Sequence, residues 1–160
     1  MDNKTIRLLY LLDSRIEQCT ECPLHINGRI KPYWTVDASY LLIGNVENNT
    51  FLWELMEKQG FFKKQFLIIN NLNCISKDQN PSYINICKKW VDLYVNAVLP
   101  LRGMIFGNYL IENGMIELRR INNLNMPIIP MVKSITPKFA KLSVKGTNLL
   151  EQAIVKFKLM

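Results

Sequence analysis

Four cysteines are the residues of this chain whose type and spacing point most directly to chemistry. They occur as Cys19-x2-Cys22 and Cys74-x12-Cys87, with a long gap between the pairs. A C-x2-C turn presents two thiolates to one metal centre, and a second pair completes a set of four sulfur ligands. Structural zinc usually takes an equally tight second pair or two histidines, whereas a looser second pair suits a bulkier iron–sulfur cluster. The spacing alone leaves an iron–sulfur cluster, a zinc ion and four unrelated buried thiols open.

We expect these thiols to stay reduced, because the sequence predicts a cytosolic protein. The N-terminus opens Met1-Asp2-Asn3-Lys4 and passes at once into mixed apolar and charged residues, without the pattern of a signal peptide. The longest apolar runs are far shorter than a membrane-spanning helix requires, so no membrane partner is expected. We therefore expect a cytoplasmic protein, of a bacterium or of a virus-infected host, without structural disulfides.

Length and composition predict one folded domain. The chain has 160 residues, 49% of them hydrophobic and 21% charged, which is too apolar for a disordered chain and unlike fibrous or collagen-like proteins. A chain of this length supports a single hydrophobic core. We expect residues 1–160 to form one domain.

The charge of the chain is positive and unevenly distributed. Lys and Arg number 20 against 13 Asp and Glu, a formal net charge of +7. The C-terminal part is especially basic: from residue 131 onward the only acid is Glu151, against Lys133, Lys138, Lys141, Lys145, Lys156 and Lys158. Such an excess favours a phosphate-backbone partner such as DNA, although it also fits a solvated helix face. Heavy use of Asn, Ile and Lys, the residues of AT-rich codons, points to a phage, a mobile element or an AT-rich genome.

Hydrophobic periodicity predicts alternating helices and strands. Helices are expected at 5–16, from a cap at Asn49 or Thr50 to Gly60, after Ser82 to about Val98, at 108–118 and at 142–157, and strands at 40–43, 66–69, 101–106 and 127–132. This alternation predicts the α/β class, with helices on both faces of an open parallel sheet. We expect a three-layer α/β/α sandwich around a mainly parallel, four-stranded sheet.

The loops that follow the strands are where such a fold places its functional residues. In open α/β sheets, ligands bind in the crevice at the carboxyl ends of the strands. The loops expected there are 44–48, 70–73, 107–108 and 133–137.

The order of these features resembles the iron–sulfur uracil-DNA glycosylases of the family 4 and family 5 type. The segment Cys19-Thr20-Glu21-Cys22-Pro23-Leu24 is similar to the family's C-x2-C-x-L, with Arg29 in place of a following arginine. A strand ending at Gly44, a Leu-rich helix ending at Gly60, the segment Phe66 to Cys74, and Pro81 before Cys87 follow in the family's order. The resemblance covers the whole chain, and it implies that the four cysteines hold a 4Fe–4S cluster on a uracil-DNA glycosylase-like fold.

The catalytic residues that the resemblance implies are only partly present. The family hydrolyses the N-glycosidic bond of a flipped uracil, and here Asn45 or Glu47 would hold the attacking water while Asn70 would read the uracil edge. The family's Pro-Gly and the segment with its stacking aromatic are missing after Gly44. Thr136 stands where the family has a histidine that stabilises the leaving uracil, and loss of such a donor costs about a hundred- to a thousand-fold. The only histidine, His25, lies beside the cysteines.

The same resemblance implies a DNA-contacting loop near the C-terminus. The family's His-Pro-Ser type segment enters the minor groove, and Ser134-Ile135-Thr136-Pro137-Lys138 matches it through Pro137. The residues expected to contact DNA are Lys133, Ser134, Pro137, Lys138, Lys141 and Lys145.

Retained cysteines with degraded catalytic motifs predict a DNA-binding scaffold that is not an efficient enzyme. We expect an accessory subunit of a viral or mobile-element replication or transcription machine, with a polymerase or another protein complex as partner. One alternative is an active, divergent uracil-DNA glycosylase of base excision repair. A second alternative is a zinc-stabilised protein-interaction module.

Overall fold

The structure is a computed structural model, and it describes residues 1–77, 80–106, 128–131 and 141–160. In chain order its elements are α1 (Asn3–Glu17), η1 (Pro23–Asn27), β1 (Tyr40–Ile43), α2 (Thr50–Lys58), η2 (Lys63–Gln65), β2 (Phe66–Ile69), α3 (Pro81–Val98), β3 (Gly103–Phe106), β4 (Ile128–Met131) and α6 (Val144–Leu159). The α/β class predicted from the sequence is confirmed. The helix predicted at 108–118 lies outside the described residues. Of the described helices, none combines the length and apolar character that a membrane crossing requires.

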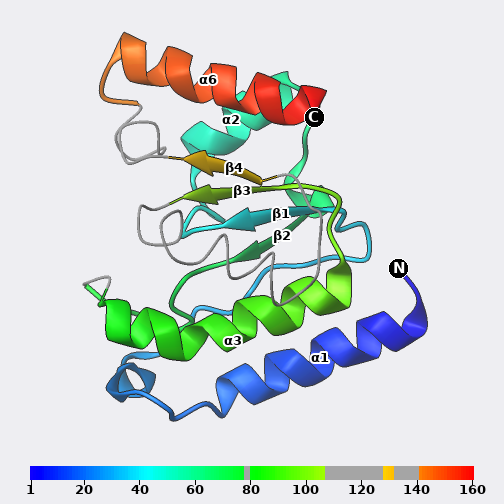
Figure 1. Cartoon of the computed structure of the whole chain (residues 1–160), viewed down its shortest axis with the longest axis vertical. Coiled ribbons are helices and arrows are strands. Elements are labelled where there is room, and N and C mark those ends of the chain that lie inside the picture. Colours follow the sequence, from blue (N-terminus) through cyan, green and yellow to red (C-terminus); the bar gives the residue numbers. More distant parts are fainter. Residues whose placement is uncertain (78–79, 107–127, 132–140) are drawn as a thin grey trace.

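The strands form one sheet in the order β2-β1-β3-β4, and every neighbouring pair is parallel. Ile43 at the end of β1 pairs with Ile69 of β2 and with Ile105 of β3. The strands therefore end together at one edge of the sheet, on the left in Figure 1. The loops after β1 and β2 start side by side at this edge, as expected for a parallel sheet.

Helices cover both faces of the sheet (Figure 1). Because side chains alternate along a strand, Leu41 and Ile43 face α1 and α3, whereas Leu42 faces α2 and α6. The described strands β1, β2 and β3 are buried almost throughout, as expected for parallel strands covered on both faces. Two apolar cores result, one on each side of the sheet.

Short polar side chains cap the helices, and of these caps the sequence analysis predicted the one at Asn49. Asp2 accepts a hydrogen bond from the Thr5 backbone N–H at 2.8 Å, and Asn49 accepts one from Leu52 at 2.9 Å. Asn80 and Ser143 cap α3 and α6 in the same way. These caps satisfy backbone donors that the first helical turn leaves free.

The third strand is shorter than the predicted 101–106, since β3 begins at Gly103. The chain leaves α3 through Leu99 in the left-handed conformation, with φ of 52°, and then through Pro100. The chain continues through Leu101 and Arg102, the two residues that the sequence analysis gave to the strand, before β3 begins. Gly103 then approaches β1 closely, because an added Cβ would lie 3.0 Å from the Cβ of Leu41.

A buried polar network fixes α1 against α3. The Tyr94 hydroxyl donates to Asp13 Oδ1 at 2.5 Å, and the Trp34 indole N–H donates to the same carboxylate at 3.1 Å. Burial, together with the neighbouring Asp13 carboxylate, raises the pKa of Tyr94 well above its ordinary value. The network therefore holds the two helices that flank the cysteines.

Candidate metal centre

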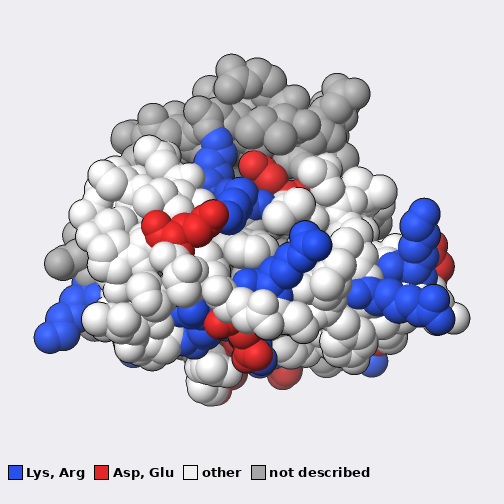
Figure 2. Space-filling model, turned by 90° about the horizontal axis from the view of Figure 1, so that it is seen from below, with Lys and Arg blue, Asp and Glu red and all other residues white. Residues whose placement is uncertain are grey.

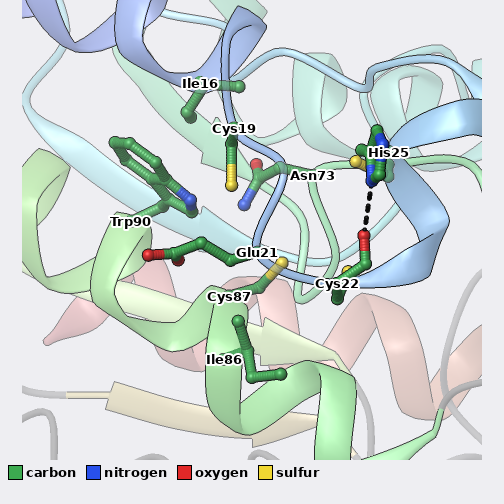
Figure 3. A pocket seen from close by; sticks show the side chains of 10 residues that line it. Ile16, Cys19, Glu21, Cys22, His25, Asn73, Ile86, Cys87 and Trp90 are labelled. Atoms are coloured by element: carbon green, nitrogen blue, oxygen red, sulfur yellow. Dashed lines mark hydrogen bonds between the residues drawn. The ribbon is translucent and has the colours of Figure 1, made fainter.

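The structure brings all four cysteines to the wall of one cavity. Cys19 and Cys22 lie in the turn between α1 and η1, Cys74 follows β2, and Cys87 lies in the first half of α3. All four are free thiols, and they line one small, partly open cavity of about 10 Å³. Figure 3 shows Cys19, Cys22 and Cys87 around this space. The two pairs predicted to act together therefore do meet.

A short stretch of backbone pairing brings the first cysteine pair to the second. The Ile30 N–H donates to the Asn73 carbonyl at 2.9 Å, and the Ile75 N–H donates to the Gly28 carbonyl at 3.0 Å. Arg29 and Cys74 consequently face each other as an antiparallel bridge. Gly28 has φ of +101°, a conformation that glycine adopts without strain. The loop after η1 thus runs alongside the loop after β2.

Arg29 connects the end of α1 to this pairing. Its guanidinium donates to the Ile16 carbonyl at 3.1 Å, the His25 carbonyl at 2.9 Å and the Cys19 carbonyl at 2.5 Å, and to Cys74 Sγ at 3.2 Å. A cation is favourable at the C-terminal end of a helix, where carbonyls have no helical partner. Arg29 therefore caps the C-terminal end of α1, and it holds the loop that carries Cys19 against Cys74.

We expect Arg29→Lys to destabilise the protein, because one ammonium cannot reach acceptors on several segments as a planar guanidinium does. The loss should be about 1.5–3 kcal/mol, the net value of one hydrogen bond to a charged group, or roughly 3–12 °C in Tm. Thermal unfolding checks the loss, and Arg15→Lys in the last turn of α1 is the matched control. An unchanged Tm for Arg29→Lys would show that these contacts do not stabilise the loop.

Two of the thiols are held in their neutral form by burial. Burial raises the pKa of Cys74, against the opposing influence of the Arg29 charge. Burial also raises the pKa of Cys87, against a hydrogen bond from the backbone of Asn73. In both cases the other cysteines, which line the same cavity, raise the pKa further. A metal that binds here must displace thiol protons.

The remaining wall of the cavity is held in place by contacts of its own. Glu21 forms an ion pair with Lys89 of α3. The His25 Nδ1–H donates to the Cys22 carbonyl at 2.8 Å, drawn as the dashed line in Figure 3. Ile16, Ile86 and Trp90 complete the lining. His25 thus lies beside the cysteines, as its position in the sequence predicts.

The donor set fits an iron–sulfur cluster in kind, because four cysteine thiolates are its usual ligands. Four cysteines also form structural zinc sites, in which the ligands lie about 2.3 Å from a single ion. Among the residues that the structure describes, no three His, Cys, Asp or Glu side chains gather closely enough to hold one metal ion.

Gly44 and Asn70 directly follow β1 and β2, where the predicted crevice would lie. Gly44 has φ of +147°, and a Cβ there would lie 3.0 Å from the Cβ of Phe106, so only glycine fits without strain. Asn70 is 8% exposed, and its Oδ1 accepts the Asn71 backbone N–H at 2.9 Å. The Asn70 side chain therefore makes a local turn contact, the ordinary role of an asparagine after a strand.

Asn45 and Glu47 lie in the loop that joins β1 to α2. Asn45 is exposed, while the half-buried Glu47 forms an ion pair with Lys63 at 3.3 Å. The Trp53 indole N–H donates to the Val46 carbonyl at 3.1 Å and to the Glu47 carbonyl at 2.9 Å. These contacts hold the loop on α2 and turn the Glu47 carboxylate toward η2.

The DNA-contacting residues predicted near the C-terminus are described only in part. Lys141 and Lys145 are exposed, and Lys145 lies in the first turn of α6. Thr136, together with Lys133, Ser134, Pro137 and Lys138, lies outside the described residues. The predicted crevice loops at 107–108 and 133–137 lie outside them as well.

The sequence analysis missed the part that Asn73 plays in the site. Asn73 lines the cysteine cavity, and its backbone bonds to both Ile30 and Cys87. In the sequence, only the position of Asn73 next to Cys74 indicated a role, and that position does not show which way its side chain points.

Comparison with known proteins adds no further residue, since no protein-family model and no curated protein matches this sequence.

Proposed function

We propose that this chain is a DNA-binding iron–sulfur protein on a uracil-DNA glycosylase-like scaffold, impaired in uracil excision. In this proposal it serves as an accessory subunit of a viral or mobile-element replication or transcription machine. The observation that carries the proposal is the meeting of Cys19, Cys22, Cys74 and Cys87 at one cavity. Chance burial of four thiols does not account for their convergence from three separate segments of the chain.

The surroundings of the cysteines support a cluster rather than zinc. The Arg29 guanidinium donates a hydrogen bond to Cys74 Sγ. Hydrogen bonds to ligand sulfurs are a usual feature of iron–sulfur sites. When bound, the cluster supplies iron–thiolate bonds that join the turn after α1 to the loop after β2 and to α3.

We expect the anaerobically purified protein to be brown, with about four irons and four acid-labile sulfides per chain. Elemental analysis, a sulfide assay and the visible absorption spectrum check this content. Protein made with an iron supply that contains one zinc per chain, and neither iron nor sulfide, would contradict the cluster and favour the zinc alternative.

The distribution of charge supports a DNA interface at the strand-end edge. The chain has a net charge of +7. On the face formed by α1 and α3, however, basic and acidic side chains are interspersed (Figure 2). The ion pairs Lys31–Glu17 and Lys89–Glu21 each join one of these helices to a residue that flanks η1. Lys141 and Lys145 are exposed at the start of α6, which lies at the edge where the strands end (Figure 1). We place the phosphate contacts there.

We expect DNA binding to weaken steeply with salt, because each phosphate contact releases counterions. Lys141→Ala and Lys145→Ala should each lower the slope of log K against log salt by about one unit. The measurement is fluorescence anisotropy of a labelled oligonucleotide over a series of salt concentrations. Lys4→Ala, exposed at the opposite edge of the molecule (Figure 1), is the control and should leave the slope unchanged. Salt-insensitive binding, or none at low salt, would overturn the DNA proposal.

A further inference from the structure

The side chain of Asn73 is buried against the cysteines without a hydrogen bond. Asn73 is 2% exposed and lines the same cavity as the four thiols. Within the described part of the chain, neither its Nδ2 nor its Oδ1 has a hydrogen-bond partner. Figure 3 shows its amide directed into the space between Cys19 and Cys87.

This arrangement is costly unless the cavity supplies a partner. A buried polar group without a hydrogen bond costs about 1–3 kcal/mol, so native proteins rarely keep one without a reason. The backbone of Asn73 is already fixed, since its carbonyl accepts from Ile30 at 2.9 Å and its backbone bonds to the Cys87 thiol. The amide therefore stays at the cavity, where the ligands are sulfur atoms and an N–H group is the complementary donor.

We propose that the Asn73 side-chain amide donates a hydrogen bond to a sulfur of the metal centre, either a cysteine thiolate or an inorganic sulfide, and so raises its reduction potential. The proposal rests on the iron–sulfur function proposed above. A donated N–H stabilises negative charge on sulfur, and the reduced cluster carries one more negative charge than the oxidised one. Hydrogen bonds to the sulfurs are among the factors that set cluster potentials. Asn73 is thus a tuning residue rather than a ligand.

The test is the reduction potential of the cluster-loaded protein, measured by film voltammetry. Asn73→Leu keeps the approximate size of the side chain and removes the donor. We expect it to lower the ratio of reduced to oxidised cluster about tenfold at a fixed potential, a shift of about 59 mV for one electron. Asn73→Thr keeps one hydroxyl donor and should recover part of the shift. Asn71→Leu is the matched control, because Asn71 is a buried asparagine outside the lining of the cavity.

A second measurement needs no variant and covers the case in which Asn73→Leu fails to assemble its cluster. Wild-type protein labelled with ¹⁵N only in its asparagine side-chain amides should show a ¹⁵N hyperfine coupling to the reduced cluster. A loaded wild type without this coupling, or a loaded Asn73→Leu with the wild-type potential, overturns the inference about Asn73 alone. A wild type that holds no cluster overturns the proposed function, and the inference with it.

Discussion

Replacing Cys22 or Cys74 with serine is expected to abolish the metal centre. Iron should fall from about four per chain to near zero, with loss of the brown colour. The protein should become insoluble or sensitive to protease, because the free energy of metal binding at a structural site is also free energy of folding. We expect an effect of this size because the metal centre would join three separate segments of the chain, so that loss of one ligand affects all of them.

The structure explains why one lost ligand should affect the whole site. Cys22 begins the η1 turn, which contains no buried residue of its own. The loop after β2 is held by its bridge to Gly28 and Ile30 and by the Arg29 contact with Cys74 Sγ. Serine at either position removes a sulfur ligand, and the remaining thiols then stay buried without the metal bonds that would offset the cost of their burial. Segments with few buried apolar contacts are the first to open locally.

Iron and sulfide content, thermal unfolding and limited proteolysis measure the outcome for each variant. Thr20→Ser is the matched control, because Thr20 is exposed in the same turn between Cys19 and Cys22. The control should keep its iron and its Tm. Serine variants of Cys22 and Cys74 that melt like the wild type would show that the cysteines are incidental.

Uracil excision is the second large expected effect, and we expect it to be undetectable or about 10³- to 10⁵-fold slower than in an active uracil-DNA glycosylase. The range combines two losses. A missing donor toward the leaving group costs about 10²- to 10³-fold, and Thr136 lacks the positive charge that histidine supplies. A lost stacking contact with a base costs about 1–3 kcal/mol, which is a further factor of about 5 to 150.

The structure supports the loss of the stacking contact. Since β1 ends at Ile43 and α2 begins at Thr50, only residues 44–49 connect them. The loop contains no aromatic residue, and Trp53, the nearest indole along the chain, is buried and donates to the loop backbone. A flipped base would find no aromatic wall in this loop. Flipping costs a few kcal/mol that such a pocket normally offsets.

Single-turnover cleavage of a uracil-containing single strand measures excision, with an active uracil-DNA glycosylase under the same conditions as reference. Asn45→Ala and Asn70→Ala should make no difference. Excision at ordinary enzyme rates that either substitution abolishes would establish the divergent glycosylase instead. Activity gained by Thr136→His alone would show that the uracil pocket survives and that only the electrostatic partner of the leaving group was lost.

The sequence by itself determined the α/β class and the places of most described elements. Buried parallel strands are continuous apolar runs, such as Tyr40–Ile43 and Phe66–Ile69, so their composition identifies them without reference to neighbours. Capping residues such as Asp2 and Asn80 act within three residues of their own position, and local hydrogen bonds of this kind can be read from the sequence.

The tertiary structure alone decided how the cysteine pairs meet and what surrounds them. The pairing of Gly28 and Ile30 with the loop after β2, and the contact of Arg29 with Cys74, join residues that are far apart in the chain. The place of Asn73 at the cavity depends on two backbone bonds, to Ile30 and to Cys87, that no spacing in the sequence records. Ligand type is a property of single residues, which the sequence shows, whereas burial and hydrogen bonding depend on packing between distant segments.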